Sequence, residues 1–232
     1  VSEAGTEATR MEGDSDGATD TISQYSSKKP LADSKPKPLV SPEENRSSPI
    51  HEGDIYLPRE VVHDLPASER FRIIRAKIER LNLLHDNYRV IAVTSSVQSE
   101  GKSVISANLA RALSLDPLGK TVIVDCDLRR PNVHSFFSVP RRPGLTDSVY
   151  RSIPLEAVAI PITHSLDVVP AGSELIDPAQ GVERPEFAQF VSDLRMRYRY
   201  VILDCPPVLL CPEPITISLI ADTSLLVVRA CS

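Results

Sequence analysis

A short segment of this 232-residue chain has the residue types and spacing that bind phosphate. Residues 96–103 read Ser-Val-Gln-Ser-Glu-Gly-Lys-Ser, which is the phosphate-loop pattern G-x-x-x-x-G-K-S/T with Ser96 in place of the first glycine. In such a loop, backbone N–H groups and the positive end of the following helix bind phosphate oxygens. Lys102 would reach the β- and γ-phosphates, and the Ser103 hydroxyl would be a ligand of Mg²⁺. An ordinary strand–turn–helix corner with an exposed lysine is the less favoured interpretation.

Three aspartates follow two other apolar segments. Asp125 and Asp127 come after the run that starts at Thr121, and Asp204 comes after the run that starts at Tyr200. Ligands of open α/β sheets bind outside the carboxyl ends of the strands, so these carboxylates would lie beside the phosphate loop. Taken singly, each aspartate is more simply a helix N-cap or a loop residue. Taken together, they predict a site for Mg²⁺ and a nucleotide.

The apolar pattern around these residues predicts an α/β fold. Continuously apolar runs indicate buried strands, and the stretches between them have helical character. This alternation predicts a doubly wound, mainly parallel sheet with helices on both faces, as in P-loop NTPases. Before the first strand, Phe71, Ile74, Ile78 and Leu81 recur at helical spacing. The expected strands are 89–94, 121–125, 166–169, 200–204 and 224–228, and the expected later helices are 103–115, about 186–197 and about 215–220.

Composition divides the chain into two parts. Residues 1–57 are rich in Ser, Thr, Pro, Lys, Asp and Glu and poor in large apolar side chains. Such a segment cannot offset an ordering cost of ~1–2 kcal/mol per residue, so we expect a disordered polar tail. A tether or docking arm is the functional alternative. Residues 58–232 are expected to form the P-loop domain.

Several classes of protein are excluded by composition. No stretch approaches the roughly 20 apolar residues that span a bilayer, and the first fifty residues lack the apolar region of a signal peptide. We therefore expect no integral membrane segment. The net charge of −5 argues against a protein that coats nucleic acid. The four cysteines have no zinc-ligand spacing, and the two that directly follow aspartates in apolar runs, Cys126 and Cys205, indicate buried thiols in a reducing cytosol.

These motifs together resemble the bacterial tyrosine kinases of polysaccharide export, a branch of the MinD/ParA-like P-loop ATPases. The resemblance covers residues 58–232. It rests on the Glu-Gly-Lys-Ser loop, Asn108-Leu109-Ala110, the Asp-x-Asp-x-Arg segment with Arg130-Pro131, Gly144-Leu145, and Asp204-x-Pro206-Pro207. It implies an ATP-dependent protein-tyrosine kinase of the autokinase type that acts in exopolysaccharide biosynthesis or export, with ATP and Mg²⁺ as cofactors.

The resemblance also implies a role for individual residues. The catalytic residues would be Lys102, Asp125 and Asp127, with Asp127 as a metal ligand or as the base for the tyrosine hydroxyl. The Mg²⁺ ligands would be Ser103, Asp125 and Asp204. The nucleotide contacts would be Ser99, Glu100, Gly101, Lys102, Ser103 and Val104.

Partners are implied by the same resemblance. Glu69, Arg72 and Arg75 match the family's E-x2-R-x2-R motif, which packs kinase domains into rings, and they fall on one side of the expected helix. A solvated charged face is the alternative. The implied partners are further copies of the chain, a membrane adaptor or chain-length determinant protein, and a protein with an acceptor tyrosine. The implied location is the cytoplasm, at the inner face of the membrane.

The sequence departs from the family pattern in three places. It ends at Ser232, before the family's tyrosine-rich tail, so the C-terminal part of the family domain is expected to be missing. Glu213 stands where the family has aspartate, and the family's Pro-Asn-Pro segment has no match. A regulatory ATP-binding subunit without kinase activity is therefore the alternative function. A MinD/ParA-like positioning ATPase ranks last, because Val97 replaces that group's early lysine.

A basic region follows the second acidic motif. It consists of Arg129, Arg130, His134, Arg141 and Arg142. Solvated loop charge is the favoured interpretation of this region. Contact with nucleotide phosphate, or with an acidic tail of a partner, is the alternative.

Overall fold

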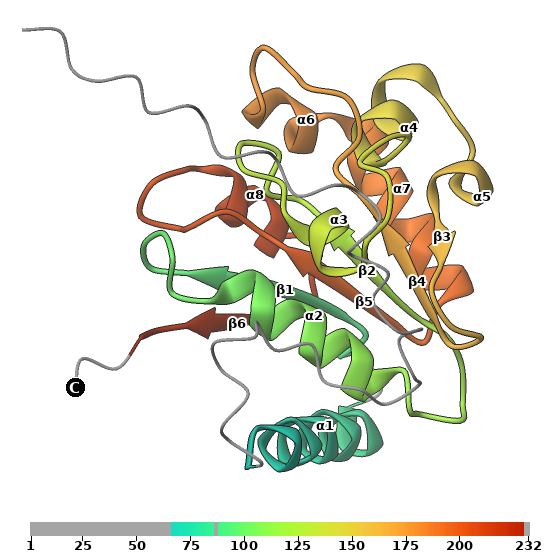
Figure 1. The fold of residues 1–232 in the computed structure, drawn as a ribbon, viewed down its shortest axis with the longest axis vertical. Helices are drawn as coiled ribbons and strands as arrows, with labels where there is room; N and C mark the ends of the chain where they lie inside the picture. The colour runs from blue at the N-terminus through green and yellow to red at the C-terminus, as the bar shows by residue number, and fades with distance from the viewer. Residues whose placement is uncertain (1–65, 86–87, 230–232) are drawn as a thin grey trace, which may run out of the picture. The chain divides into compact units, whose positions relative to one another are not determined.

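The computed structural model describes residues 66–85 and 88–229, and within them the strands form one six-stranded sheet (Figure 1). The strand order is β3-β4-β2-β5-β1-β6, in which only the pairing of β3 with β4 is antiparallel. The strands are β1 (Val90–Ser95), β2 (Thr121–Asp125), β3 (Ile160–Pro161), β4 (Leu166–Val169), β5 (Tyr200–Asp204) and β6 (Thr223–Val227).

Helices cover both faces of this sheet. On one face Ile91, Ile123 and Ile202 pack in a core with side chains of α1, α2 and α3. On the other face Val122 and Leu203 pack in a second core with side chains of α4 to α8. The helices are α1 (Pro66–His85), α2 (Lys102–Leu113), α3 (Val133–Phe136), α4 (Leu145–Arg151), α5 (Leu155–Val158), α6 (Ala179–Glu183), α7 (Pro185–Arg197) and α8 (Glu213–Ser218).

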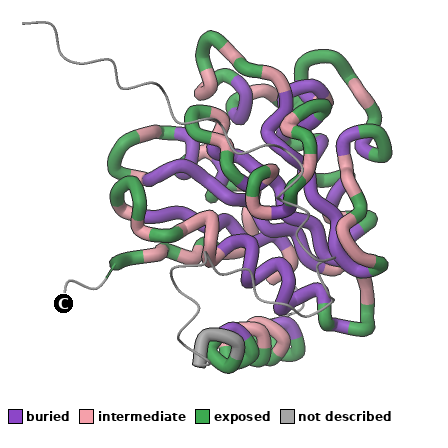
Figure 2. Tube along the Cα trace, viewed as in Figure 1, coloured by how far each residue is buried: buried purple, intermediate pink, exposed green. Residues whose placement is uncertain are grey.

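The central strands of the sheet are buried, and its edge strand β6 is more exposed. Every residue of β1, β2, β4 and β5 is buried (Figure 2), because each of these strands has helices on both sides. The edge strand β6 instead alternates between half-buried and exposed residues. The continuous apolar pattern of the central strands therefore reflects coverage on both faces.

The predicted doubly wound architecture is confirmed. The five predicted strands are present within one residue at each end, and the three later helices are present with shifted ends. The short elements β3 and α3 to α6 were not predicted. The proposed polar tail, residues 1–57, lies outside the described residues. None of the helices in 66–85 and 88–229 combines the length and the apolar character needed to cross a bilayer.

The first helix docks on α2. Phe71 is buried in the core beneath α1, and Ile74 and Ile78 are half-buried along the same side, as their spacing predicted. Leu81 departs from the prediction, because it is 40% exposed. Asn82, in the last turn of the helix, holds the chain that follows. Its Oδ1 accepts a hydrogen bond from the Tyr88 backbone N–H at 2.8 Å.

Candidate nucleotide-binding and catalytic site

The strand order brings the three chemical motifs together. β5 lies between β1 and β2, so the carboxyl ends of these three strands are neighbours at one edge of the sheet. Asp204 pairs in register with Asp125 on one side and with Val93 on the other. The phosphate loop leaves β1 at this edge, the segment with Asp127 leaves β2, and Asp204 ends β5. Three segments that are far apart in sequence thereby form one site.

The phosphate loop is held in a tight backbone conformation. Ser99 and Gly101 have positive φ angles of 65° and 90°, and Gly101 is the residue directly before α2. Glycine adopts this left-handed conformation without steric cost. The Glu100 carboxylate accepts hydrogen bonds from the backbone N–H groups of Val97 at 2.9 Å and Arg229 at 3.2 Å. The side chain of Glu100 therefore braces the loop.

Lys102 lies among carboxylates. Its Nζ is 2.8 Å from Asp127 Oδ2 and 3.6 Å from Asp204 Oδ2, and its side chain is only 12% exposed. Burial alone would lower the pKa of Lys102, but the charges of Asp204 and Asp127 outweigh burial and raise it. Lys102 is therefore a fixed cation at the start of α2, where the helix N-terminus also favours an anion.

Asp204 is fully buried, and hydroxyl groups of α2 bind it. Ser103 Oγ donates a hydrogen bond to its Oδ2 at 2.7 Å, and Ser106 Oγ donates one to its Oδ1 at 2.8 Å. Burial raises the pKa of Asp204, and Lys102 and the two hydroxyls oppose that rise. Ser106 was missed in the sequence. Its position three residues after Ser103, on the same side of a helix, was the available signal.

Asp125 is also fully buried, and one of its oxygens fits a cation. Oδ2 accepts hydrogen bonds from the backbone N–H groups of Asn132 and Val133, both at 2.9 Å. Oδ1 has no hydrogen-bond partner among the described residues. Burial raises the pKa of Asp125 well above its usual range, and the charge of Asp204 adds to that effect. Oδ1 of Asp125 is thus an unpaired oxygen beside a second buried carboxylate, Asp204. Such an oxygen suits Mg²⁺ or its water shell.

The described residues do not form a complete metal cage. Within 66–85 and 88–229, no three His, Cys, Asp or Glu side chains are arranged to hold an ion by themselves. Mg²⁺ in nucleotide sites takes one or two carboxylates and completes its shell with phosphates and water. Ser103, Asp125 and Asp204 therefore fit such an ion by their chemistry, and their role as ligands stays a prediction.

A cavity of about 420 Å³ opens at this edge of the sheet. Its walls include Ser99, Gly101, Lys102, Ser103 and Val104 from the predicted nucleotide contacts, with Asp127, Arg130 and Phe136 opposite the loop. The cavity therefore joins the phosphate loop to the second acidic motif. It has the mixture of backbone N–H groups and basic side chains that binds a nucleoside phosphate.

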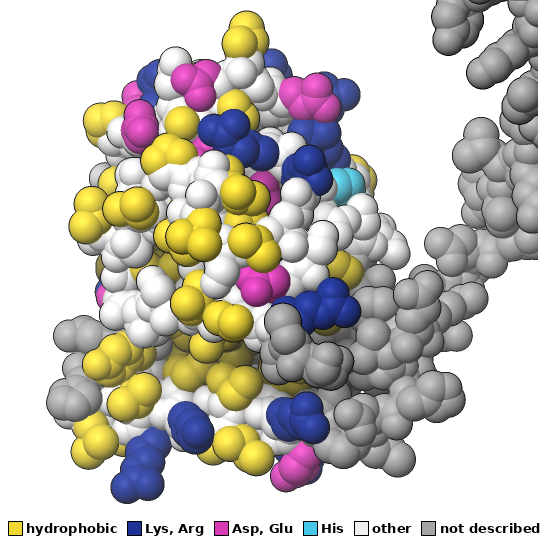
Figure 3. Space-filling view, turned by 90° about the vertical axis from the view of Figure 1, so that its left-hand side faces the viewer, with side chains coloured by type: hydrophobic (Ala, Val, Ile, Leu, Met, Phe, Trp, Pro, Cys, Tyr) yellow, Lys and Arg dark blue, Asp and Glu magenta, His cyan; other side chains and the backbone are white. Residues whose placement is uncertain are grey.

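Exposed apolar side chains lie near the polar cavity. Figure 3 looks onto the side of the molecule with the phosphate loop and the segment after β5, where many hydrophobic side chains lie among polar and charged ones. In that segment the Leu209 N–H bonds the Ser96 carbonyl at 3.3 Å, which places it beside the loop. Val97, Leu209 and Leu210 are 45%, 72% and 61% exposed. The part of the rim formed by the loop and the segment after β5 is therefore apolar.

The other predicted residues lie elsewhere. Glu69 and Arg72 form an exposed ion pair on α1 at 3.3 Å. Arg75 differs from them, because it pairs with Glu79 at 2.7 Å and its Nη1 lies 3.5 Å from the Ala112 carbonyl of α2. Their role in assembly stays a prediction.

Comparisons with known proteins show the family of this chain. No family model matches the chain. The tyrosine-protein kinase YwqD of Bacillus subtilis strain 168 is 31% identical over 164 residues, which are 70% of this chain and 68% of YwqD. CapB of Staphylococcus aureus is 30% identical over 151 residues, 63% of this chain, and the chain spans 65% of CapB, slightly less than two thirds. The kinase domain of the Escherichia coli tyrosine kinase ETK matches with a TM-score of 0.67 at 25% identity, over 80% of this chain and 71% of that one. The chain belongs to the family of bacterial tyrosine-protein kinases, as its motifs predicted.

Proposed function

We propose that this protein transfers the γ-phosphoryl group of ATP to tyrosine hydroxyls of proteins in an exopolysaccharide or capsule system. The observation that carries the proposal is the position of Lys102, which lies at the N-terminus of α2 and contacts carboxylates that follow β2 and β5. Family membership supports a tyrosine as the acceptor.

Each part of the site has a chemical task in this reaction. The N–H groups of the loop and the Lys102 ammonium bind the phosphates, so that the γ-phosphorus faces the acceptor. Ser103, Asp125 and Asp204 would hold Mg²⁺, which neutralises charge on the phosphates. The tyrosine oxygen bonds to the γ-phosphorus, the bond to ADP breaks, and the phenolic proton passes to Asp127 or to water. A carboxylate is a weak base toward a phenol with a pKa of about 10, so positioning contributes more than proton removal.

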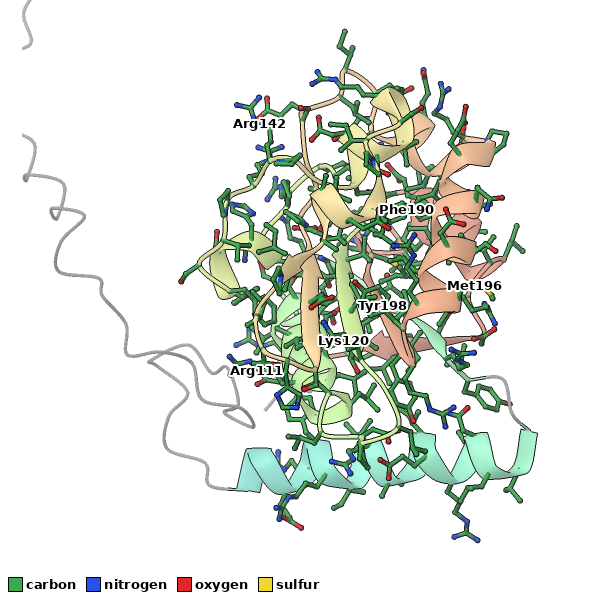
Figure 4. The ribbon with its side chains drawn as sticks, turned by 90° about the vertical axis from the view of Figure 1, so that its right-hand side faces the viewer. Arg111, Lys120, Arg142, Phe190, Met196 and Tyr198 are labelled. Atoms are coloured by element: carbon green, nitrogen blue, oxygen red, sulfur yellow. The ribbon has the colours of Figure 1, made fainter. Side chains whose placement is uncertain are left out.

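The acceptor tyrosine is proposed to come from another polypeptide. In residues 88–229, Tyr198 donates its hydroxyl hydrogen to Asp167 at 2.7 Å, and Lys120 lies on the other oxygen of that carboxylate (Figure 4). Tyr200 is fully buried, Tyr88 is half-buried, and Tyr150, which is 37% exposed, does not line the cavity. The apolar rim beside the cavity supports the approach of an aromatic side chain from outside.

The proposed surroundings of the enzyme follow from its family. The partners are other copies of this chain, which would meet through the charged residues of α1, and a membrane adaptor or chain-length determinant protein. The proposed location is the cytoplasm, at the inner face of the membrane. The exposed pair of Glu69 and Arg72 supports the first contact, because both side chains are accessible to a second molecule.

The experiment is phosphoryl transfer from γ-labelled ATP with Mg²⁺, to the chain itself and to a tyrosine-rich peptide. We expect Lys102→Met to lower the transfer rate at least 100-fold, because a buried cation that contacts the phosphates is lost. The matched control is Lys120→Met, since Lys120 also pairs with an aspartate, Asp167 at 3.4 Å, but at the opposite end of β2.

Two experimental outcomes would overturn the proposed kinase function. ATP binding without any phosphotyrosine, on the chain or on the peptide, would identify a regulatory ATP-binding subunit. Equal transfer by the wild type and Lys102→Met would place the chemistry at another site. Thermal melts of each variant show whether a lost signal reflects lost folding.

A further inference from the structure

An ion pair between an exposed arginine and a buried glutamate joins the turn after β2 to α8. Arg129 Nε donates to Glu213 Oε1 at 2.8 Å, and the Glu213 side chain is 2% exposed, whereas Arg129 is 43% exposed. Glu213 is the first residue of α8, so the pair joins two elements that are 84 positions apart in the chain. This contact was not predicted, although the sequence singled out both residues.

The same turn carries two residues of the cavity. Asp127 and Arg130 line the cavity, and Arg129 between them does not. The Arg130 backbone N–H donates to Asp127 Oδ1 at 3.0 Å, while the other oxygen of Asp127 faces Lys102. Adjacent arginines therefore have different surroundings. One is tied to α8, and the other is exposed at the wall of a cavity suited to phosphate.

The buried Glu213 carboxylate depends on Arg129 for its ion pair. Its second oxygen, Oε2, is buried without a hydrogen-bond partner among the described residues. A buried carboxylate is costly unless it is paired, so loss of Arg129 leaves an uncompensated charge under the turn. Relief of that charge through movement of the turn displaces Asp127 and Arg130, which belong to the same turn.

We propose that Glu213 acts as a positioning residue, which fixes the turn 127–130 through Arg129, and that Arg130 is the side chain of this turn that contacts the terminal phosphate of bound ATP. The inference deepens the proposed function, on which its kinetic readout rests, but its binding readout does not need phosphoryl transfer. Arg130 has no ion-pair partner within the described ranges, so its guanidinium is available to a phosphate.

The first test measures the binding of Mg·ATP and Mg·ADP to the full chain by calorimetry. We expect Arg130→Gln to weaken ATP binding about tenfold or more and ADP binding about twofold or less, because only ATP has the phosphate that Arg130 contacts. Equal weakening of both nucleotides, or no change in either, would overturn the assignment of Arg130.

The second test is a double-mutant cycle with Arg129→Gln and Glu213→Gln. Each single variant is expected to reduce the preference for ATP over ADP, and the double variant to be no worse than the worse single one, because the two side chains act as a unit. The matched control is Arg195→Gln, which breaks the 2.6 Å pair with Asp222 at the amino ends of the strands. It should leave the preference unchanged.

A purely structural role of the Arg129–Glu213 pair would give a different experimental result. In that case Arg129→Gln would lower the melting temperature and leave both the ATP preference and kcat per folded molecule at the wild-type level, which would overturn the positioning role. If Arg129→Gln does not fold, Arg129→Lys keeps the charge opposite Glu213 and should retain at least part of the preference. If the wild type shows the expected nucleotide preference but transfers no phosphate to the chain or to the peptide, the proposed kinase activity is overturned and the role of Arg130 in nucleotide binding stands.

Discussion

At the scale of single residues, the site contains buried carboxylates that are stabilised by only a few hydrogen-bond donors and one lysine. Asp125 and Asp204 are both completely buried and lie in register on neighbouring strands. Asp204 depends on Lys102 and on two hydroxyl groups, of which Ser106 is the fully buried one. The carboxylates are therefore ready for a cation, and each donor around them contributes to stability as well as to binding.

Ser106→Ala tests that dependence. The substitution leaves Asp204 Oδ1 without its donor, so we expect a loss of about 1–3 kcal/mol in the free energy of unfolding, measured with urea. The control is Ser218→Ala on α8, where an exposed hydroxyl bonds the Ile215 carbonyl at 2.7 Å and its loss should cost less than about 0.5 kcal/mol. Equal effects of the two substitutions would contradict the role given to Ser106.

The sequence predicted the functional residues that belong to a motif. It did not predict the contacts that depend on how distant segments pack. The loop residues and the three aspartates were predicted, since each motif places them at the end of a strand. The Arg129–Glu213 pair was not, because a contact between two distant loops has no local pattern. The basic region divides accordingly: Arg129 and Arg141 have acidic partners, whereas Arg130 lines the cavity.

At the scale of elements, periodicity predicted the long elements and missed the short ones. Helix α7 and the central strands have enough residues for a period of 3.6 or a continuous apolar run to appear. Strand β3 has two residues, and α3 and α5 have four each, which is too short for either signal. Their conformations depend on contacts with the sheet that no local pattern encodes.

Phe71→Ala tests the docking of α1. Phe71 is 6% exposed and packs in the core that α1 shares with α2, so we expect a loss of about 3 kcal/mol in the free energy of unfolding. Ile73, on the same helix but 52% exposed, provides the control, because Ile73→Ala should cost no more than about 0.5 kcal/mol. Urea titrations of both variants measure the difference, and a similar small loss for both would show that α1 is not anchored by Phe71.

At the scale of the whole molecule, α1 has two different sides. The side with Phe71 faces the domain, and Arg75 is held there by Glu79 and the end of α2. Glu69 and Arg72 remain on the surface, with side chains that are 64% and 72% exposed. An exposed pair of this kind contributes little to the stability of its own chain, so its two residues can be removed without unfolding the protein. Any effect of their removal then reports on contacts with another molecule.

The combined substitution Glu69→Ala and Arg72→Ala is therefore expected to abolish self-association and to leave the melting temperature within about 2 °C of the wild type. Sedimentation velocity over a range of concentrations measures the first effect, and a thermal melt measures the second. Lys77→Ala is the control, because Lys77 is an exposed charge on the same helix outside the motif. Assembly of the double variant equal to that of the wild type, or a wild type that stays monomeric throughout, would leave α1 as a solvated face and place any assembly on another surface.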